Sequence, residues 1–516
     1  MKKNCYISTS IAYVNGAPHL GFALESIITD SLARFKRLNA IDTFFLTGTD
    51  EHGIKVYKTA QENEITAAEL CEKNSQKFQE LTQALNISHN DFIRTSDSKK
   101  HWPSAKVIWN RLEQSGDIYK KAYEGIYCEG CETFMQNKDL IEGLCPHHKK
   151  APLKISEENY FFRLSKYSDT ILDLIESKKI EIVPDFRKNE IVTMLKDSGL
   201  KDVSFSRPKE NLPWGIPVPN DETQIMYVWC DALVNYISAL DYANPDSVLY
   251  KKYWEQSERI HVIGKDIVRF HAGIWIGMLL SSNIPLPSKI IIHGFLTSEG
   301  EKMSKSLGNV IDPFLEIEKY GTDAVRYFLL SQIPLGQDYD FKREQFENIY
   351  NAHLANNLGN LVNRVHTLCI KDNIQAHMIL DTQEINNKPN SLSFLFKEEI
   401  DQFWKDYNQH MKSYEIHKAL ETVYKVLCFA NKQMDITKPW ILSKNDPQAL
   451  IEILPPFLEF LRHVALMLSP FMPTTSQNIY NVLGIKKQIT AINSQWNAEK
   501  DNWNTLGEKM ILFPRI

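Results

Sequence analysis

The sequence Ala-Pro-His-Leu-Gly-Phe at residues 17–22 lies where a β-like run, residues 6–14, gives way to an amphipathic helical pattern. Apolar residues in that pattern recur at three- and four-residue spacings, as on one face of an α-helix. Pro18 suits a first helical turn, so His19 is expected at the helix N-terminus, where backbone N–H groups bind phosphate. Gly21 has no side chain to obstruct a flat base. Together these features predict a nucleotide site with His19 beside the phosphates.

A second stretch, Lys-Met-Ser-Lys-Ser at residues 302–306, follows another β-like run and lies in a loop bounded by Gly300 and Gly308. Its two lysines, Lys302 and Lys305, can reach toward a polyphosphate as mobile cations. Taken singly, the two stretches are equally compatible with a surface histidine and a solvated loop. Their occurrence in this order, each after a predicted strand, favours a nucleotide site.

The two stretches resemble the signature motifs of class I aminoacyl-tRNA synthetases, usually written His-Ile-Gly-His and Lys-Met-Ser-Lys-Ser. The rest of the likeness, from about residue 5 to about residue 445, is to the methionyl-tRNA synthetase family. It rests on FLTGTDEHG (45–53), SRP (206–208), WGIP (214–217), YVWCDA (227–232) and HVIGKD (261–266). The chain departs from the family at Phe22, where a histidine is usual. A phenyl ring cannot donate to a phosphate, so that contact is missing or supplied elsewhere, with His52 as one candidate.

With 516 residues, the chain is too long for one core and is expected to divide into three or four compact units. The predicted class is α/β, with a doubly wound parallel-sheet (Rossmann-like) catalytic domain split by a zinc-bearing insertion and followed by an α-helical bundle. Runs at 224–229, 260–264 and 290–295 are expected to complete the sheet. The expected boundaries are 1–115 (catalytic, first half), 116–220 (insertion), 221–311 (catalytic, second half), 312–346 (connecting, stem-contact region) and 347–516 (anticodon-binding bundle).

Composition limits the choice of partners. The apolar content of 43% is ordinary for a globular protein, and the net charge of −5 argues against a general attraction for nucleic acid. Any tRNA surface must therefore come from local basic patches. No signal-like run follows Met1, and no apolar stretch approaches the length of a membrane span, so a cytoplasmic protein is expected.

Three of the eight cysteines cluster in the insertion. Cys128 and Cys131 form one closely spaced pair, and Cys145 precedes His147 and His148. Thiolates and one imidazole at this spacing predict a tetrahedral structural zinc site, with a disulfide as the alternative. Spacing alone does not decide whether His147 or His148 would be the fourth zinc ligand. The family motif favours His148, so the ligand set implied by the resemblance is Cys128, Cys131, Cys145 and His148.

The resemblance implies activation of methionine by ATP, with Mg²⁺ accompanying the nucleotide, and transfer of methionine to tRNA-Met, initiator and elongator. Its catalytic residues would be His19, Lys302 and Lys305, and its ATP-binding residues would also include Gly21, Glu25, Gly264 and Asp266. Its methionine pocket would comprise Ile11, Tyr13, Asp50, Trp229, Ala232, Leu233, Tyr236, Ile267, Phe270, His271 and Trp275. Its anticodon contacts would be Asn360, Arg364 and Trp440.

Three alternatives stay open at this point. Another class I synthetase would share the nucleotide motifs, but the leucine, isoleucine and valine enzymes need a larger insertion. A nucleotidyltransferase of related fold would not need the helical C-terminal region. A noncatalytic descendant would agree with Phe22 but not with intact His19, Lys302 and Lys305. The chain ends soon after the predicted bundle, so a monomer is expected; the segment after about residue 487 has no predicted role.

Overall fold

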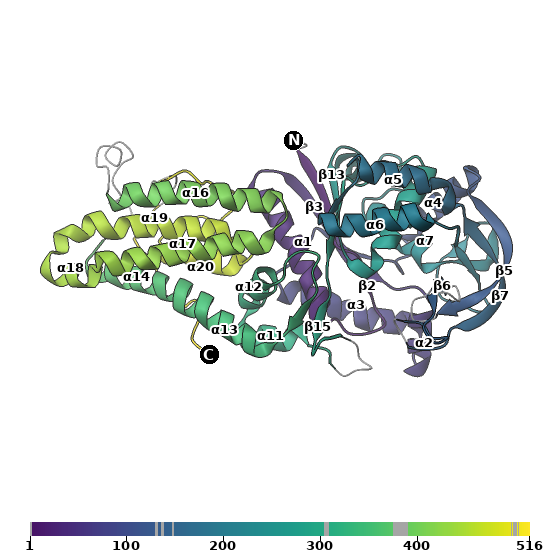
Figure 1. The fold of residues 1–516 in the computed structure, drawn as a ribbon, viewed down its shortest axis with the longest axis horizontal. Helices are drawn as coiled ribbons and strands as arrows, with labels where there is room; N and C mark the ends of the chain where they lie inside the picture. Colours follow the sequence, from purple (N-terminus) through teal and green to yellow (C-terminus); the bar gives the residue numbers. More distant parts are fainter. Residues whose placement is uncertain are drawn as a thin grey trace. The chain divides into compact units, whose positions relative to one another are not determined.

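The computed structural model describes residues 3–128, 133–135, 139–146, 149–303, 309–374, 391–496, 498, 503 and 505–516. The chain forms two compact units (Figure 1). The first comprises residues 1–29, 42–83 and 87–294, and the second comprises 30–41, 84–86 and 295–516. Among the described residues, every helix is too short or too polar to cross a membrane.

The first unit is built on a parallel sheet. Within the described residues its strands have the order β2-β3-β1-β13-β14-β8, and β4 also pairs with β3. All of these pairings are parallel. The strands are β1 (Asn4–Ser8), β2 (Ala12–Tyr13), β3 (Asp42–Asp50), β4 (Asp91–Arg94), β8 (Glu181–Val183), β13 (Glu258–Gly264) and β14 (Lys289–His293). Because parallel strands end at the same edge, residues that follow them meet there.

Helices pack on this sheet through continuous apolar clusters. In one cluster, Tyr6 and Phe44 of the sheet pack with Ile108 and Trp109 of α4 (Trp102–Gln114). A second cluster joins β13 and β14 to α5 (Ser168–Glu176) and α6 (Asp185–Ser198). The other helices are α1 (Leu20–Leu38), α2 (Ile54–Glu62), α3 (Ala67–Ala84), α7 (Val228–Ala232), α8 (Asn235–Ser238), α9 (Val248–Tyr250) and α10 (Ile276–Ser281).

The predicted parallel α/β core is confirmed, and the runs at 260–264 and 290–295 lie in or overlap β13 and β14. The run at 224–229 was wrongly assigned to this sheet. It overlaps β12 (Asp221–Met226), which pairs antiparallel with β10 (Ser206–Pro208) and β11 (Pro217–Val218). The chain folds back between β11 and β12 at Asn220, whose φ is 63°. This tight local turn makes antiparallel pairing the short-range choice.

A separate antiparallel sheet lies within residues 118–204. Its order is β6-β5-β7-β9, and the long pair β5 (Ile118–Cys128) and β7 (Leu153–Phe162) forms its centre. The flanking strands are β6 (Thr133–Met135) and β9 (Val203–Ser204). Cys128 is therefore the last residue of β5.

The second unit is mainly helical, as predicted for the C-terminal region. Helices α16, α17 and α19 lie side by side (Figure 1) and contact one another pairwise. Its helices are α11 (Pro313–Tyr320), α12 (Thr322–Gln332), α13 (Arg343–Ile349), α14 (Asn360–Lys371), α16 (Leu392–Lys412), α17 (Ile416–Thr437), α18 (Pro439–Asn445), α19 (Leu450–Leu468) and α20 (Pro473–Val482). A helical segment, Tyr350–Gly359, joins α13 to α14. A small sheet contains β15 (Leu296–Ser298), β16 (Glu301–Lys302) and β17 (Tyr339–Phe341).

The segment after residue 487 packs onto this helical unit through a buried ion pair. Arg462 on α19 donates to both carboxylate oxygens of Glu459, at 2.8 and 2.6 Å. Arg462 also donates to the carbonyls of Asn493 and Gln495. Both charged side chains of the pair are fully buried. The pair thus anchors the otherwise unassigned C-terminal segment.

Removing the Glu459 charge should destabilise the protein. Burial opposes ionisation, but Arg462 outweighs it and lowers the pKa of Glu459 from 4.5 to about 2. Because the folded-state pKa is depressed, the stabilisation is present above about pH 4.5 and is lost as the pH falls toward 2. Glu459→Gln should lower the free energy of unfolding by about 3 kcal/mol at pH 7, measured by urea denaturation, and by less below pH 4.

The exposed pair Glu421 and Lys425, at 2.8 Å, provides the control. Glu421→Gln should change the unfolding free energy by less than about 0.5 kcal/mol, because solvent screens exposed pairs. Equal effects of the two substitutions would contradict a special role for the buried pair.

Candidate active site

His19 immediately precedes α1 and is held by the first turn of that helix. Its carbonyl accepts hydrogen bonds from the backbone N–H groups of Phe22 and Ala23, at 3.0 and 3.3 Å. The N–H of Gly21 donates to Nδ1 of the His19 ring at 3.0 Å. Since Nδ1 accepts, a neutral ring has its proton on Nε2. His19 can therefore offer an Nε2–H donor to an anion at the helix N-terminus.

Gly21 is required by the His19 ring itself. A Cβ atom on Gly21 would lie 2.8 Å from Cε1 and 3.0 Å from Nδ1 of His19. Any larger residue would displace the imidazole. The sequence had indicated only that this glycine keeps space for a base, which stays a prediction.

Phe22 has a packing role in this structure. Its ring meets Phe78 of α3 edge to face, with the centroids 4.8 Å apart. It packs against a cluster that includes Val56 and Leu70, so it fastens the first turn of α1 to α2 and α3. His52 was the candidate substitute for a histidine at position 22. Its Nδ1 atom is hydrogen-bonded to a carboxylate oxygen of Asp231 at 2.5 Å.

A buried ion pair links α1 to the end of β14. Glu25 accepts hydrogen bonds from the N–H and hydroxyl of Ser10 at 2.8 and 2.6 Å, and from Nε2 of His293 at 2.7 Å. Nδ1 of His293 bonds the Gly294 carbonyl, so both ring nitrogens are donors. Burial would lower the pKa of His293, but its hydrogen bond to Glu25 outweighs this and raises it.

The end of the neighbouring strand β13 lies against the same histidine. A Cβ on Gly264 would lie 3.7 Å from the His293 ring and 2.9 Å from a carboxylate oxygen of Asp266. The Asp266 residue is exposed, whereas Glu25 and His293 are buried. The sequence analysis missed His293. Its position at the end of a β-like run, as for Asp50 and Gly264, was the available signal.

Asp50 is the last residue of β3, and its carboxylate is buried. Tyr13 of β2 is its register partner, and the N–H of Val14 donates to the Asp50 carbonyl. The next residue, Glu51, is fully buried and accepts from Arg94 and from Thr49 at 2.8 and 2.7 Å. These contacts join the end of β3 to the segment at β2 and to Arg94 of β4.

His261, His271 and Tyr236 form a neutral, buried cluster. The N–H at Nδ1 of His271 donates to the Ile267 carbonyl, so Nε2 accepts from the Tyr236 hydroxyl at 2.7 Å. Burial lowers the pKa of His271 to about 4 and the pKa of His261 well below its ordinary value. An uncharged, flexible thioether side chain would suit such surroundings.

The structure gathers most of the predicted methionine pocket. Trp229 and Phe270 stack with centroids 3.7 Å apart. Seven of the predicted residues belong to or pack on the apolar cluster that contains Tyr6 and Trp109: Ile11, Tyr13, Trp229, Leu233, Tyr236, Phe270 and Trp275. Ala232 is buried on α7, whereas Ile267 packs on the other cluster, with β13 and β14. His271 joins the pocket through Tyr236.

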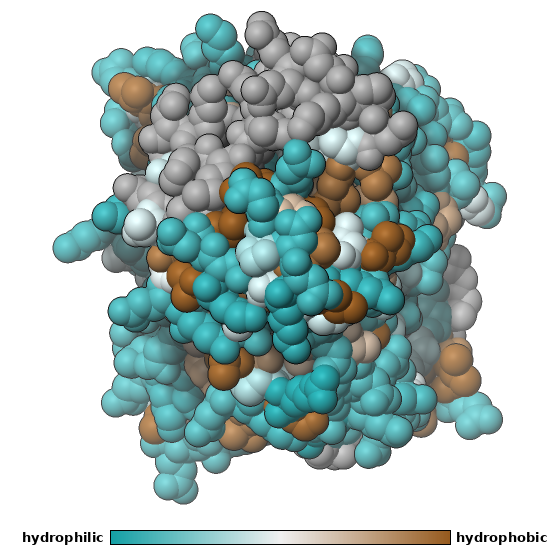
Figure 2. All heavy atoms as spheres, turned by 90° about the vertical axis from the view of Figure 1, so that its left-hand side faces the viewer, coloured by the Kyte–Doolittle hydropathy of each residue, from teal (hydrophilic) through white to brown (hydrophobic). Residues whose placement is uncertain are grey.

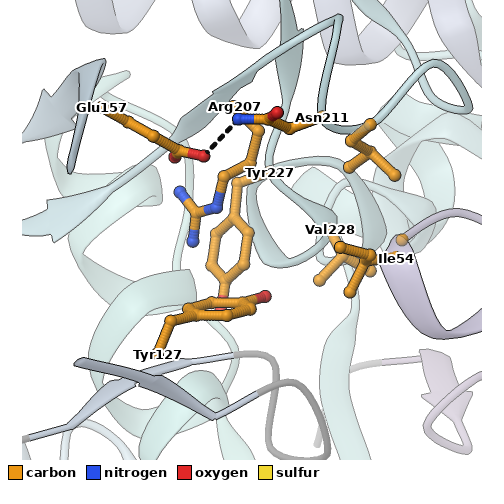
Figure 3. A pocket seen from close by; sticks show the side chains of 9 residues that line it. Ile54, Tyr127, Glu157, Arg207, Asn211, Tyr227 and Val228 are labelled. Atoms are coloured by element: carbon orange, nitrogen blue, oxygen red, sulfur yellow. Dashed lines mark hydrogen bonds between the residues drawn. The ribbon is translucent and has the colours of Figure 1, made fainter. Parts of the chain in front are cut away.

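A cavity of about 40 Å³ is lined in part by Tyr227 and Val228, the two residues before Trp229 (Figure 3). The Arg207 guanidinium lies over the Tyr227 ring at 4.6 Å and the Tyr127 ring at 5.2 Å. Asn211 donates to Glu157 at 2.7 Å on another wall. The cavity thus brings strands β5 and β7 to the residues just before Trp229. The sequence had singled out the Ser-Arg-Pro motif without a structural role.

Several predicted residues fall partly or wholly outside the described residues. The backbone of Lys302, in β16, pairs with Thr297 of β15. The Lys302 side chain and all of Lys305 lie outside the described residues. Cys128 and Cys145 are described and buried, and Cys131 and His148 are not described. Within the described residues, no group of three or more metal-ligating side chains is found.

The predicted anticodon residues lie on two helices of the second unit. Asn360 and Arg364 are on α14, and the Arg364 guanidinium lies 4.9 Å from the centre of the Trp440 ring on α18. Arg364 also pairs with Asp435 at 3.2 Å. Trp440 is 37% exposed and Ile441 is 43% exposed. Figure 2 faces the end of this unit that has α18, where apolar patches interrupt a mostly hydrophilic surface.

Comparison with known proteins agrees with this architecture. Residues 5–154 and 148–366 match the family described as tRNA synthetases class I (M), and residues 396–513 match the anticodon-binding domain of tRNA ligases. The fold and the nucleotide motif thus define a class I tRNA synthetase.

Individual relatives indicate which family of class I tRNA synthetases the chain resembles. The methionine–tRNA ligase of Rickettsia conorii is 41% identical over the whole of both chains. That of Fusobacterium nucleatum is 40% identical over 100% of this chain and 80% of the relative. A methionyl-tRNA synthetase of Mycobacterium tuberculosis, solved with methionyl-adenylate, has a TM-score of 0.91 at 37% identity, covering 100% of both chains. This chain belongs to the methionine–tRNA ligase family.

Displacing His19 through Gly21 should impair catalysis without loss of stability. Gly21→Ala should lower the rate of methionine-dependent pyrophosphate–ATP exchange by about 100-fold, because a positioned donor is lost. Alanine favours a helix over glycine, so the melting temperature should not fall. The double substitution Gly21→Ala, His19→Asn should be no worse than His19→Asn alone. Additive losses would show that Gly21 acts independently of His19.

Proposed function

We propose that methionine and ATP react at the carboxyl edge of the parallel sheet, with the site residues in the roles given below. The observation that carries the proposal is the arrangement at that edge. The His19 ring, fixed by the Gly21 N–H, precedes α1. A buried carboxylate, Asp50, ends β3 opposite Tyr13, which packs on the same apolar cluster as the Trp229–Phe270 stack. The methionine–tRNA ligase reaction needs both kinds of site.

In the first step the methionine carboxylate attacks the α-phosphorus of ATP, and pyrophosphate leaves. Nε2–H of His19 would donate to the α-phosphate as its geometry changes. Lys302 and Lys305 would neutralise the β- and γ-phosphates, and Mg²⁺ would accompany the nucleotide. Catalysis is then mainly positioning and charge stabilisation, since no covalent enzyme intermediate is needed.

The substrate groups would be distributed among three sites. Asp50 would accept the methionine ammonium group, and the Trp229–Phe270 stack and Tyr236 would surround the thioether. Gly264 and Asp266 would face the adenosine. The ion pair of Glu25 and His293 would fix the start of α1 against the end of β14 beside them. In the second step the 3′-terminal hydroxyl of tRNA attacks the methionyl carbonyl, and AMP leaves.

A structural zinc ion is also part of the proposal. Cys128 at the end of β5 and the buried Cys145 supply soft thiolates, and Cys131 with His148 would complete a set of four. That donor set fits zinc and leaves no position open for substrate. The ion would stabilise the insertion and take no part in the reaction. A monomer stays a prediction.

Amino-acid specificity tests the proposed function directly. Labelled pyrophosphate should exchange into ATP with methionine and with no other amino acid of a complete panel, in the absence of tRNA. Exchange with a different amino acid would overturn the pocket assignment. Absence of exchange with the whole panel, in a zinc-replete preparation, would overturn the proposed reaction.

Substitution of Trp440 should weaken tRNA recognition and leave adenylate formation unchanged. Loss of a stacked base is worth about 1–3 kcal/mol, so Trp440→Ala should raise the KM for tRNA in the charging assay by at least about fivefold. Pyrophosphate exchange without tRNA should be unchanged. Ile441→Ala, at the next exposed position, is the matched control and should change neither assay. Parallel losses in both assays with Trp440→Ala would indicate a packing role instead.

A further inference from the structure

A buried carboxylate joins two histidines from distant parts of the first unit. Asp231 on α7 accepts from Nδ1 of His52 at 2.5 Å and from Nε2 of His101 at 2.7 Å. His101 in turn contacts the Ser238 hydroxyl at 2.8 Å. All of these side chains are buried, and none has a role in the reaction as described above. The network ties the segment after β3 to α7.

This network determines the chemical character of His52. Burial opposes ionisation of Asp231, but the two histidines outweigh it and lower the pKa of Asp231, so its oxygens act as acceptors. Nδ1 of His52 must then be the donor. In the neutral ring Nε2 is left with a lone pair, so it is a hydrogen-bond acceptor.

The Nε2 atom of His52 is buried and has no hydrogen-bond partner among the described residues. An unpaired buried polar atom costs about 1–3 kcal/mol. Such atoms are uncommon and require an explanation, often a bound group. A second proton on this atom would only replace an unpaired acceptor with an unpaired donor.

His52 lies two residues after Asp50, which is the last residue of β3. Glu51, between them, accepts from the Thr49 hydroxyl at 2.7 Å and so is occupied elsewhere. His52 contacts α7, where Asp231 follows Trp229 by two residues.

We propose that His52 is a second acceptor for the ammonium group of the amino-acid substrate, beside Asp50. Asp231 and His101 are positioning residues that hold the His52 ring with its Nε2 lone pair available. An ammonium group has three N–H donors and can use both acceptors. The inference rests on the proposed function, because it takes methionine as the substrate and Asp50 as its first ammonium contact.

The test compares two ligands that differ only in the ammonium group: methionine and 4-(methylthio)butanoic acid. His52→Asn keeps a donor that can reach Asp231 and deletes Nε2. His366→Gln, on α14, is the control for replacing a buried histidine, because glutamine keeps a donor to the Gly507 carbonyl that the His366 ring contacts. Asp50→Ala serves as the reference for an ammonium contact. Dissociation constants are measured by isothermal titration, with competition against methionine for the weak ligand.

His52→Asn should raise the dissociation constant of methionine by about tenfold. It should change the dissociation constant of 4-(methylthio)butanoic acid by less than about twofold. His366→Gln should change neither dissociation constant by more than about twofold, and both variants should keep the wild-type melting temperature. Equal losses for both ligands with His52→Asn would overturn the proposal in favour of a packing role. Unchanged binding of both would mean that Nε2 pairs with water only.

Failure of the proposed function would look different. If Asp50→Ala weakened both ligands equally, the ammonium role of Asp50 would be wrong, whatever the result for His52. A loss confined to methionine in Asp50→Ala, with no such loss in His52→Asn, would overturn the inference on His52 alone.

Discussion

The parallel alignment of β3, β1, β13 and β14 is the constraint on which the site depends. Strands in this order end at one edge of the sheet, so Asp50 comes to the same edge as Gly264 and His293, although it precedes both by more than 200 residues in the sequence. The segment after β1 leads into His19 and α1 at the same edge. A methionine site and a nucleotide site can therefore share a boundary, which the transfer of an adenylyl group between their ligands requires.

Buried polar contacts hold that edge in place. Glu25 with His293 joins α1 to β14, Glu51 with Arg94 joins β3 to β4, and Asp231 joins α7 to the end of β3. Each charged group has a partner, as burial requires. The walls of the proposed methionine pocket are neutral by contrast, because burial keeps His261 and His271 uncharged through lowered pKa values. Charged side chains at this edge thus occur in pairs, and the aromatic walls carry none.

Much of this could be predicted from the sequence, for identifiable reasons. The helix after residue 19, the strand ends at Asp50 and Gly264 and the helical C-terminal region follow from local periodicity and turn residues. Individual side-chain contacts could not be predicted, whether between distant residues, as for Phe22 with Phe78 and Asp231 between His52 and His101, or within one motif, as for Gly21 under the His19 ring. The run at 224–229 was misassigned because periodicity identifies a strand and not its partner.

The most direct test of the account is a crystal structure with a non-hydrolysable methionyl-adenylate analogue. The account predicts the ammonium group at Asp50, the thioether between Trp229 and Tyr236, and the phosphate replacement nearest Nε2 of His19. The ribose should lie at Gly264 and Asp266. An analogue bound with its ammonium group away from Asp50, or with its phosphate replacement remote from the start of α1, would contradict the account.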